Sequence, residues 1–234
     1  MGKGKLNKFA EMRAFVNVFQ PEFDEVFQKD FKLKGQWNKS FFKNENPIVL
    51  ELGCGKGDYT VGLAERIPDT NFIGVDIKGA RIWKGAKYAV ENNLPNVAFI
   101  RTRIELIDSF FGGDEIHEIW LTFPDPQLKK RRNKKRLTGL RYFSLYQKFL
   151  RDDGIIHLKT DNAVLFDFTR DLIVHNNLEI IHSTSDLYHS DLEGPVRDIQ
   201  TFYEKQFLEE NLKIHYLCFR LKQDIDLKEF EQDG

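Results

Sequence analysis

A glycine-rich segment that begins with an acid, residues 51–57, is the first part of the sequence that could hold a ligand. It reads Glu-Leu-Gly-Cys-Gly-Lys-Gly, and alternating glycines let a backbone turn sharply and approach a bound molecule closely. A dinucleotide site has the spacing G-x-G-x-x-G and directs a helix N-terminus at a pyrophosphate. The spacing G-x-G-x-G and the carboxylate of Glu51, which would repel a diphosphate, favour a positively charged ligand. We therefore expect S-adenosylmethionine at Glu51, Gly53 and Gly55, with a nicotinamide dinucleotide as the weaker alternative.

A second acid follows the next apolar run. Asp76 ends the segment Asn-Phe-Ile-Gly-Val-Asp that starts at residue 71. A carboxylate in this place can accept hydrogen bonds from the two ribose hydroxyls of a nucleoside. Both candidate cofactors carry that ribose, so Asp76 indicates a nucleoside and leaves its identity open.

An acid between two prolines, followed by a run of cations, forms a candidate reaction site. Residues 123–126 read Phe-Pro-Asp-Pro, and the prolines stiffen the backbone around Asp125. Residues 129–136 read Lys-Lys-Arg-Arg-Asn-Lys-Lys-Arg, although the whole chain has a net charge of −1. Such a basic segment on a mildly acidic body indicates a polyanionic partner, whereas a solvated loop would have the same composition. The neighbouring acid favours chemistry on a nucleic acid whose phosphates contact the basic segment.

Asp161 follows another apolar run, residues 154–159. It could cap the helix expected after it. It could also accept hydrogen bonds from the N1 proton and the exocyclic amine of guanine, and both interpretations stay open.

Cys54 and Cys218 do not follow a proline, as the nucleophile of cytosine C5 methylation normally does. The histidines show no metal-binding spacing, so we expect no metal site.

Short apolar runs precede all these candidate residues, and we predict that the runs are strands. The predicted strands are 48–52, 71–76, 97–100, 116–123, 154–159, 178–182 and 214–220, with helices at 58–67, 78–92, 138–151 and 163–175. Strands that alternate with helices indicate an α/β fold with a mostly parallel sheet covered on both faces. Such sheets bind ligands beyond the carboxyl ends of their strands, where the candidate residues fall.

The composition is that of a globular protein, with 234 residues of which 41% are hydrophobic. Residues 1–45 are expected to be an N-terminal extension packed on a domain at 46–234. No apolar stretch reaches the roughly 18–20 residues of a membrane span, and residues 1–8 lack the apolar stretch of a signal peptide. With only two cysteines, a cytoplasmic protein without a membrane partner is expected.

Four motifs together resemble a known family. They are Glu51-Leu-Gly-x-Gly-x-Gly57, Phe123-Pro-Asp-Pro126 with the basic segment, Thr160-Asp161 and Thr201-Phe-Tyr-Glu204. Between about residues 45 and 220, the sequence resembles the bacterial tRNA (guanine-46-N7) methyltransferases of the TrmB family. The resemblance implies the class I S-adenosylmethionine-dependent methyltransferase fold, Rossmann-like, with a seven-stranded, mostly parallel sheet and helices on both faces. It also implies methyl transfer to N7 of a guanosine in the variable loop of tRNA. For the assembly of the protein, a monomer or a homodimer is expected.

The resemblance also assigns roles to residues by position. Glu51 and Asp76 would hold the cofactor, and Asp125 would lie where cofactor and substrate meet. The guanosine would be contacted by Lys129, Asp161, Thr201, Phe202, Tyr203 and Glu204. The RNA phosphates would be contacted by Arg131, Arg132, Asn133, Lys134, Lys135 and Arg136.

Two positions depart from the family pattern. Gln127 stands where the family usually has Trp. Arg103 stands where an acid or amide usually contacts the adenine, and Glu105 could make that contact instead.

The expected reaction needs little acid–base chemistry. Guanine N7 carries an in-plane lone pair, so alignment of the reactants supplies much of the rate, and Asp125 is expected to position the site without acting as an obligatory base. The main alternatives are a catalytically silent RNA-binding protein on the same fold and a methyltransferase for another RNA or a protein. A nicotinamide-dependent oxidoreductase is a weaker alternative.

Overall fold

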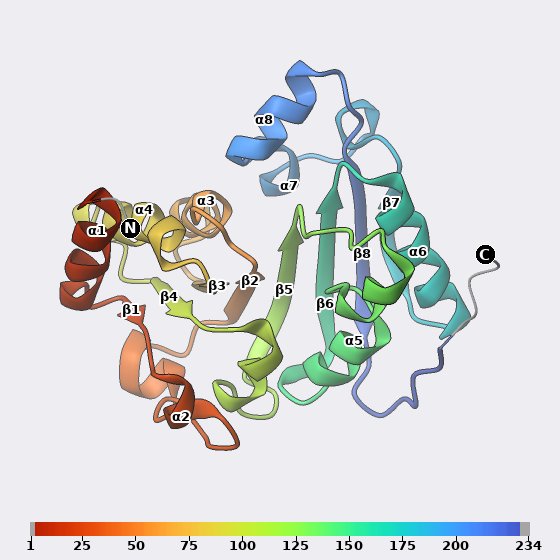
Figure 1. Cartoon of the computed structure of the whole chain (residues 1–234). Coiled ribbons are helices and arrows are strands. Elements are labelled where there is room, and N and C mark those ends of the chain that lie inside the picture. Colours follow the sequence, from red (N-terminus) through yellow and green to blue (C-terminus); the bar gives the residue numbers. More distant parts are fainter. Residues whose placement is uncertain (1–2, 230–234) are drawn as a thin grey trace.

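The computed structural model describes residues 3–229, which form an eight-stranded sheet between two layers of helices (Figure 1). The strand order is β1-β4-β3-β2-β5-β6-β8-β7. All neighbouring strands are parallel except β8, which runs antiparallel to both β6 and β7. The strands are β1 (Val18–Phe19), β2 (Ile48–Leu52), β3 (Asn71–Asp76), β4 (Val97–Arg101), β5 (Ile116–Thr122), β6 (Leu150–Thr160), β7 (Ile180–Thr184) and β8 (His215–Leu221).

The α-helices differ widely in length. They are α1 (Lys3–Ala14), α2 (Phe23–Val26), α3 (Asp58–Arg66), α4 (Gly79–Glu91), α5 (Leu140–Tyr146), α6 (Ala163–His175), α7 (Pro195–Asp198) and α8 (Phe202–Glu209). The other helical elements of the described residues are a π-helix, η1 (Trp37–Phe42), and three 3₁₀-helices: η2 (Ile104–Ser109), η3 (Lys130–Lys135) and η4 (Leu187–His189).

Two hydrophobic cores lie on opposite faces of the sheet. In β2, Val49 packs with the core under α3 and α4, whereas Leu50 and Leu52 pack with the core under α5 and α6. All five residues of β2 are buried, because helices cover both faces of a central parallel strand. Figure 1 shows α7 and α8 above the carboxyl ends of β5 and β6, so these ends lie beneath a helical cover.

Most predicted elements are confirmed. β2, β3 and α6 have the predicted bounds, and the predicted strands at 97–100 and 116–123 are each within one residue of the structure. The predicted helix at 138–151 ends earlier, because α5 stops at Tyr146 and Leu150 already pairs with Ile116 as the start of β6. The apolar residues that follow α5 continued its helical spacing, although they belong to a turn and a strand.

The N-terminal segment adds a strand beyond the seven that the resemblance implied. β1 pairs with β4 in parallel, and the Phe99 amide donates to the Asn17 carbonyl at 2.8 Å. Trp37 is fully buried, and its indole Nε1 donates to the Phe110 carbonyl at 2.9 Å. A strand of two residues has no detectable alternation in sequence, so this pairing could not be predicted. The division of the chain at residue 45 stays a prediction, and its outermost residues, 1–2 and 230–234, lie outside the described part.

No helix within residues 3–229 combines the length and the hydrophobicity needed to cross a membrane.

Candidate active site

The glycine loop, residues 51–57, connects β2 to α3 in a conformation that requires glycine. Gly53, Gly55 and Gly57 have φ angles of 82°, 56° and 73°, in the left-handed region. The amides of Gly53 and Cys54 both donate to the Val75 carbonyl, at 2.8 and 3.0 Å. A Cβ on Gly57 would lie 2.7 Å from the Phe99 ring. The loop is therefore held tightly against the carboxyl end of β3.

Glu51 is buried at the start of this loop, with 3% of its surface exposed. One carboxylate oxygen accepts hydrogen bonds from the amide and the hydroxyl of Thr60, and the other accepts from the Thr122 hydroxyl. Burial raises the pKa of Glu51 to about 7, against the lowering effect of these hydrogen bonds. At neutral pH the side chain is thus close to half ionised, and a nearby cation would favour the charged form.

Asp76 lies at the end of β3, where it accepts two backbone hydrogen bonds. Its Oδ2 accepts from the Gly55 amide at 3.0 Å, and its Oδ1 accepts from the Lys78 amide at 2.7 Å. A carboxylate has about four lone-pair sites, so each oxygen keeps one for a further donor. Asp76 therefore orders the glycine loop and can still accept from two hydroxyls.

Asp76 also lines a cavity of about 380 Å³. The cavity walls come from the loops after β2, β3 and β4 and from the segment around α5. They are formed by Gly53, Asp76, Ile77, Thr102, Arg103, Ile104, Glu105, Leu137 and Tyr142. Arg103 and Glu105, the two predicted adenine contacts, both line this cavity, so the choice between them stays open.

A smaller cavity, of about 90 Å³, is also lined by Gly53. Glu51 and Gly55 line it from the glycine loop, and Thr201, Phe202 and Tyr203 line it from the start of α8. The Lys56 ammonium lies 3.5 Å from the centre of the Phe202 ring, which links the glycine loop to α8 directly. Phe202 and Tyr203 are 48% and 45% exposed and meet edge to face, with ring centres 5.6 Å apart. The structure thus brings three of the four residues of the Thr-Phe-Tyr-Glu motif to the glycine loop.

Asp125 is exposed on the Pro-Asp-Pro loop, residues 123–128, which follows β5. Its Oδ1 accepts a hydrogen bond from the Gln127 amide at 3.0 Å. Phe123 and Gln127 have φ angles of 51° and 48°, which are costly for residues other than glycine. The Phe123 amide donates to the Lys159 carbonyl at 2.7 Å, and its ring lies 5.6 Å from that of Phe207. Asp125 lines neither of the two cavities described above.

The basic segment, residues 129–136, separates into exposed and buried cations. Lys129, Arg131, Arg132, Lys134 and Lys135 are exposed along η3, and Asn133 is half-buried. Arg136 is only 2% exposed.

Arg136 uses its side chain inside the protein. Its Nε donates to the Pro126 carbonyl at 3.0 Å, and its guanidinium lies 4.3 Å from the centre of the Phe168 ring. This placement does not fit the predicted contact of Arg136 with RNA phosphates. Instead, the residue holds the Pro-Asp-Pro loop against α6.

Asp161 and Glu204 also occupy positions that the sequence did not reveal. The side chain of Asn162 caps α6 by accepting from the Leu165 amide at 2.9 Å, so Asp161 is not the cap of this helix. Asp161 is half-buried at the end of β6. Glu204 is 0% exposed and forms an ion pair with Lys159 at 2.7 Å. A fully buried Glu204 does not fit the predicted direct contact with guanosine.

Thr60, Thr122 and Lys159 are functional candidates that sequence reasoning missed. The two threonines bind Glu51, and Lys159 binds Glu204. Thr122 and Lys159 each stand near the carboxyl end of a predicted strand, so their location at the ligand-binding edge was available as a signal. Their partners come from other segments, which sequence spacing does not show.

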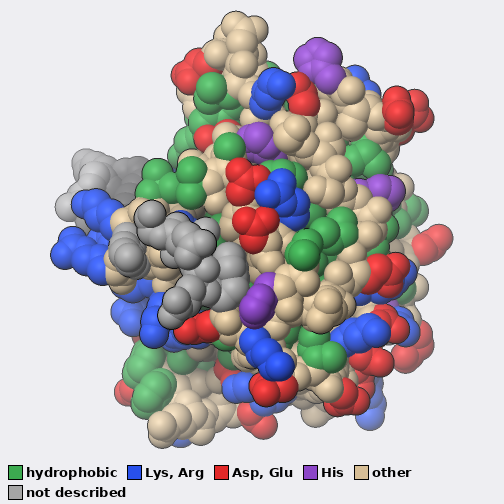
Figure 2. Space-filling view, turned by 90° about the vertical axis from the view of Figure 1, so that its right-hand side faces the viewer, with side chains coloured by type: hydrophobic (Ala, Val, Ile, Leu, Met, Phe, Trp, Pro, Cys, Tyr) green, Lys and Arg blue, Asp and Glu red, His purple; other side chains and the backbone are tan. Residues whose placement is uncertain are grey.

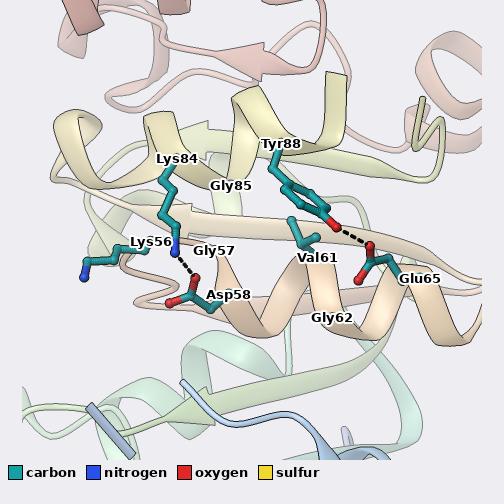
Figure 3. Close-up of a pocket in the computed structure, with 9 residues that line it drawn as sticks. All are labelled: Lys56, Gly57, Asp58, Val61, Gly62, Glu65, Lys84, Gly85 and Tyr88. Carbon is teal, nitrogen blue, oxygen red and sulfur yellow. Dashed lines mark hydrogen bonds and ion pairs between the residues drawn. The ribbon is translucent and has the colours of Figure 1, made fainter. Parts of the chain in front are cut away.

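Figure 3 shows a groove between α3 and α4, beside the glycine loop. It has a volume of about 270 Å³, and its polar side chains are already paired. Lys84 binds Asp58 at 2.9 Å and the Tyr88 hydroxyl donates to Glu65 at 2.7 Å, while Lys56 extends away from Asp58 (Figure 3). None of the predicted site residues lines this groove.

The face of α6 and β7 mixes acidic and basic side chains, as Figure 2 shows. Arg170 pairs with Asp167 and Asp171, at 3.1 and 3.0 Å, and Arg220 pairs with Glu179 at 3.3 Å. These paired cations contrast with the exposed cations of the basic segment.

Among the described residues, no three His, Cys, Asp or Glu side chains are grouped to hold a metal ion.

The model of a family described as "Putative methyltransferase" matches residues 45–217. The tRNA (guanine-N(7)-)-methyltransferase of Bacteroides fragilis (strain YCH46) is 52% identical, over 98% of this chain and 90% of the relative. The enzyme with the same name from Clostridioides difficile (strain 630) is 37% identical, over 78% of this chain and 84% of the relative. The chain belongs to the tRNA (guanine-N(7)-)-methyltransferase family. The resemblance carried by the four motifs is therefore confirmed.

Solved structures agree with this family at the level of the fold. The 16S rRNA methyltransferase KamB superposes with a TM-score of 0.61 at 14% sequence identity, over 83% of this chain and 95% of that protein. A structure described as an antibiotic-related methyltransferase superposes with a TM-score of 0.59 at 16% identity, over 82% and 96%. At these identities the likeness shows the fold alone. The tRNA (guanine-N(7)-)-methyltransferase family member thus has the class I methyltransferase fold, with β1 as an additional edge strand.

Proposed function

We propose that the protein transfers a methyl group from S-adenosylmethionine to N7 of guanosine 46 in the variable loop of tRNA. Membership of the tRNA (guanine-N(7)-)-methyltransferase family supports the reaction and the substrate. The structural observation that carries the proposal is the pair of adjoining cavities at Gly53, one bounded by Asp76 and the other by the start of α8. The cavity with Asp76 suits a nucleoside, and the smaller cavity lies between the glycine loop and the exposed rings of Phe202 and Tyr203.

The residues of the two cavities fit S-adenosylmethionine. Asp76 has acceptor sites left for the ribose hydroxyls, in a cavity of about 380 Å³ whose walls include the Tyr142 ring. Glu51 would hold the amino group, and the positive ligand would stabilise the carboxylate against the cost of burial. Arg103 or Glu105 would contact the adenine, and Gly53 and Gly55 would approach the ligand through their backbones.

The substrate side would hold one guanine against the methyl donor. S-adenosylmethionine supplies an electrophilic methyl group, so the N7–carbon bond forms as the carbon–sulfur bond breaks and no proton has to leave. Phe202 and Tyr203 offer exposed rings on which an extruded base can stack. Asp161 would accept from the Watson–Crick edge of the guanine. Asp125 would supply negative charge near a base that becomes cationic on methylation, and would act by position and electrostatics.

The exposed cations of the basic segment would bind the RNA backbone. Phosphate contacts fix the register of an RNA on a protein and make binding dependent on salt. We assign this role to Arg131, Arg132, Lys134 and Lys135, with Lys129 next to the reaction site. We further propose that the enzyme acts in the cytoplasm as a monomer or homodimer and that it requires no metal.

Incubation of unmodified tRNA with labelled S-adenosylmethionine tests the function directly. We expect label in the tRNA and, after chemical treatment, strand scission at an N7-methylguanosine in the variable loop. Label at another nucleotide would contradict the proposed specificity, and RNA binding without label would indicate a catalytically silent protein. Calorimetry that shows binding of NADH but not of S-adenosylmethionine would overturn the assignment of the cofactor.

A further inference from the structure

We propose that the buried ion pair between Lys159 and Glu204 sets the geometry of the guanine-binding side of the site, and that Glu204 acts through this pair without touching the base. The inference rests on the proposed function and deepens it. It makes Lys159 and Glu204 positioning residues for the methyl transfer.

The ion pair is fully enclosed and has further hydrogen-bond partners. Lys159 Nζ and Glu204 Oε1 are 2.7 Å apart, and both side chains are 0% exposed. Lys159 Nζ also donates to the Ile199 carbonyl at 3.1 Å, and the Tyr188 hydroxyl donates to Glu204 Oε1 at 2.8 Å. The Tyr188 hydroxyl in turn accepts from Gln200 Nε2 at 3.1 Å. Three segments of the chain therefore meet at one pair of charges.

Glu204 also determines how α8 begins. Its Oε2 accepts from the Thr201 amide at 3.3 Å, and its own amide donates to the Thr201 hydroxyl at 3.2 Å, which together form a capping box. Phe202 and Tyr203 lie between these two residues. Because the capping box fixes the first turn of α8, Glu204 fixes the direction in which both aromatic rings leave the helix.

Lys159 connects this turn to the rest of the substrate side. Its carbonyl accepts from the Phe123 amide at 2.7 Å, at the start of the Pro-Asp-Pro loop, while its ammonium binds Glu204. Asp161 follows two residues later on the same strand end. The position of Lys159 thus relates Asp125, Asp161 and the aromatic pair to one another, although its side chain reaches none of them.

Stability alone does not account for this arrangement. Desolvation of two charges offsets most of their attraction, and apolar residues of similar size often replace a buried ion pair without loss of stability. A buried ion pair does have strict requirements of distance and direction. Those requirements serve a site in which the base must be aligned with the methyl donor.

A double-mutant cycle tests the proposal. Lys159→Met and Glu204→Gln are made singly and together, and kcat/KM for tRNA is measured alongside the dissociation constant of S-adenosylmethionine. We expect each single change to lower kcat/KM roughly tenfold or more, because the remaining buried charge displaces α8. We expect the double variant to be no worse than either single one and cofactor affinity to stay within about twofold of the wild type.

If Glu204 instead contacts the base directly, the double-mutant cycle gives a different result. In that case Glu204→Gln lowers kcat/KM, Lys159→Met leaves it unchanged or adds an independent loss, and the proposal is overturned. Lys205→Met and Glu209→Gln, which alter exposed residues of α8, are matched controls that should keep full activity. If the single variants do not fold, the double variant should still methylate tRNA, and Tyr188→Phe, which removes one hydrogen bond to Glu204, should lower kcat/KM without changing cofactor affinity. A folded but inactive double variant would overturn the proposal. Methylation by neither variant nor wild type would instead refute the proposed function.

Discussion

On the cofactor side of the site, backbone amides at neighbouring strand ends hold the glycine loop, whereas on the substrate side charged side chains from distant segments hold the loops. Gly55 donates its amide to Asp76, and the amides of Gly53 and Cys54 donate to Val75. By contrast, Lys159 binds Glu204, and Arg136 binds the Pro126 carbonyl. Backbone amides recur with many side chains, so the position of the glycine loop is largely a property of the fold, whereas Glu51 also depends on the Thr60 and Thr122 hydroxyls. The substrate side depends on particular charged residues, and this is where one methyltransferase can differ from another on a common fold.

The largest expected effect is on the cofactor side. Asp76→Ala should weaken S-adenosylmethionine binding about 100-fold, because it removes a charged acceptor to which two ribose hydroxyls donate. Calorimetry measures this change, and tRNA affinity should stay as in the wild type. Asp69→Ala, an exposed acid just before β3, is the matched control. A parallel loss of tRNA affinity in Asp76→Ala would show that the two sides are not separate.

The next effect concerns the charged network under the substrate side. His157 stacks on Trp120 at 3.8 Å and contacts Glu118 at 3.2 Å and the Tyr216 hydroxyl at 2.8 Å. Burial alone would lower the pKa of His157, but hydrogen bonds with Cys218 and Glu118 raise it to about 9. A pKa raised above its unfolded value stabilises the fold fully below about pH 6.5, and this contribution is lost as pH rises through about 9.

Denaturant unfolding should therefore show a loss of about 2 kcal/mol between pH 7 and pH 9 from this residue. His157→Gln should remove that part of the pH dependence. An unchanged pH profile in this variant would mean that the imidazole is not charged in the folded protein, and that this strand region does not rely on a buried cation.

The exposed and buried cations of the basic segment should differ in their effect on RNA binding. Lys134→Ala with Lys135→Ala should weaken tRNA binding roughly 20-fold at physiological salt and reduce the slope of log K against log salt by about 1.5–2. Arg136→Ala should leave the slope unchanged and act on kcat, because Arg136 supports the Pro-Asp-Pro loop. Lys32→Ala with Lys39→Ala removes the same charge from exposed positions of the N-terminal segment and serves as the control. An equal slope change in Arg136→Ala would place that guanidinium on the RNA.

The smallest effect is the pH dependence of cofactor binding. With a pKa of about 7 in the free protein, Glu51 is mostly ionised at pH 8 and mostly neutral at pH 6. If the carboxylate pairs with the ligand amino group, affinity for S-adenosylmethionine should fall about tenfold from pH 8 to pH 6. Titration calorimetry in buffers of different ionisation enthalpy should also detect proton release on binding. A flat profile from Glu51→Gln with normal affinity would show that the charge of Glu51 is not used.

The two sides also differed in how well the sequence predicted them. The glycine loop and Asp76 depend on local spacing, and in the structure Gly53 and Asp76 line one cavity while Glu51 and Gly55 line the other. Arg136 and Glu204 belong to motifs that were recognised, but their burial depends on Phe168 and Lys159, which lie far away in the sequence. The bounds of β2, β3 and α6 followed from their hydrophobic patterns. α8 was missed because its capping box is a weak signal next to only a few apolar residues.

The pairing of β1 with β4 has a consequence for how the chain is made. Residues 3–45 leave the ribosome before the residues they pack on, since Phe99 and Phe110 come later in the chain. Until those segments follow, Trp37 and the aromatic residues around it are exposed to solvent. Removal of the same segment from the finished protein would uncover β4 as a free sheet edge, which other chains could pair with and aggregate.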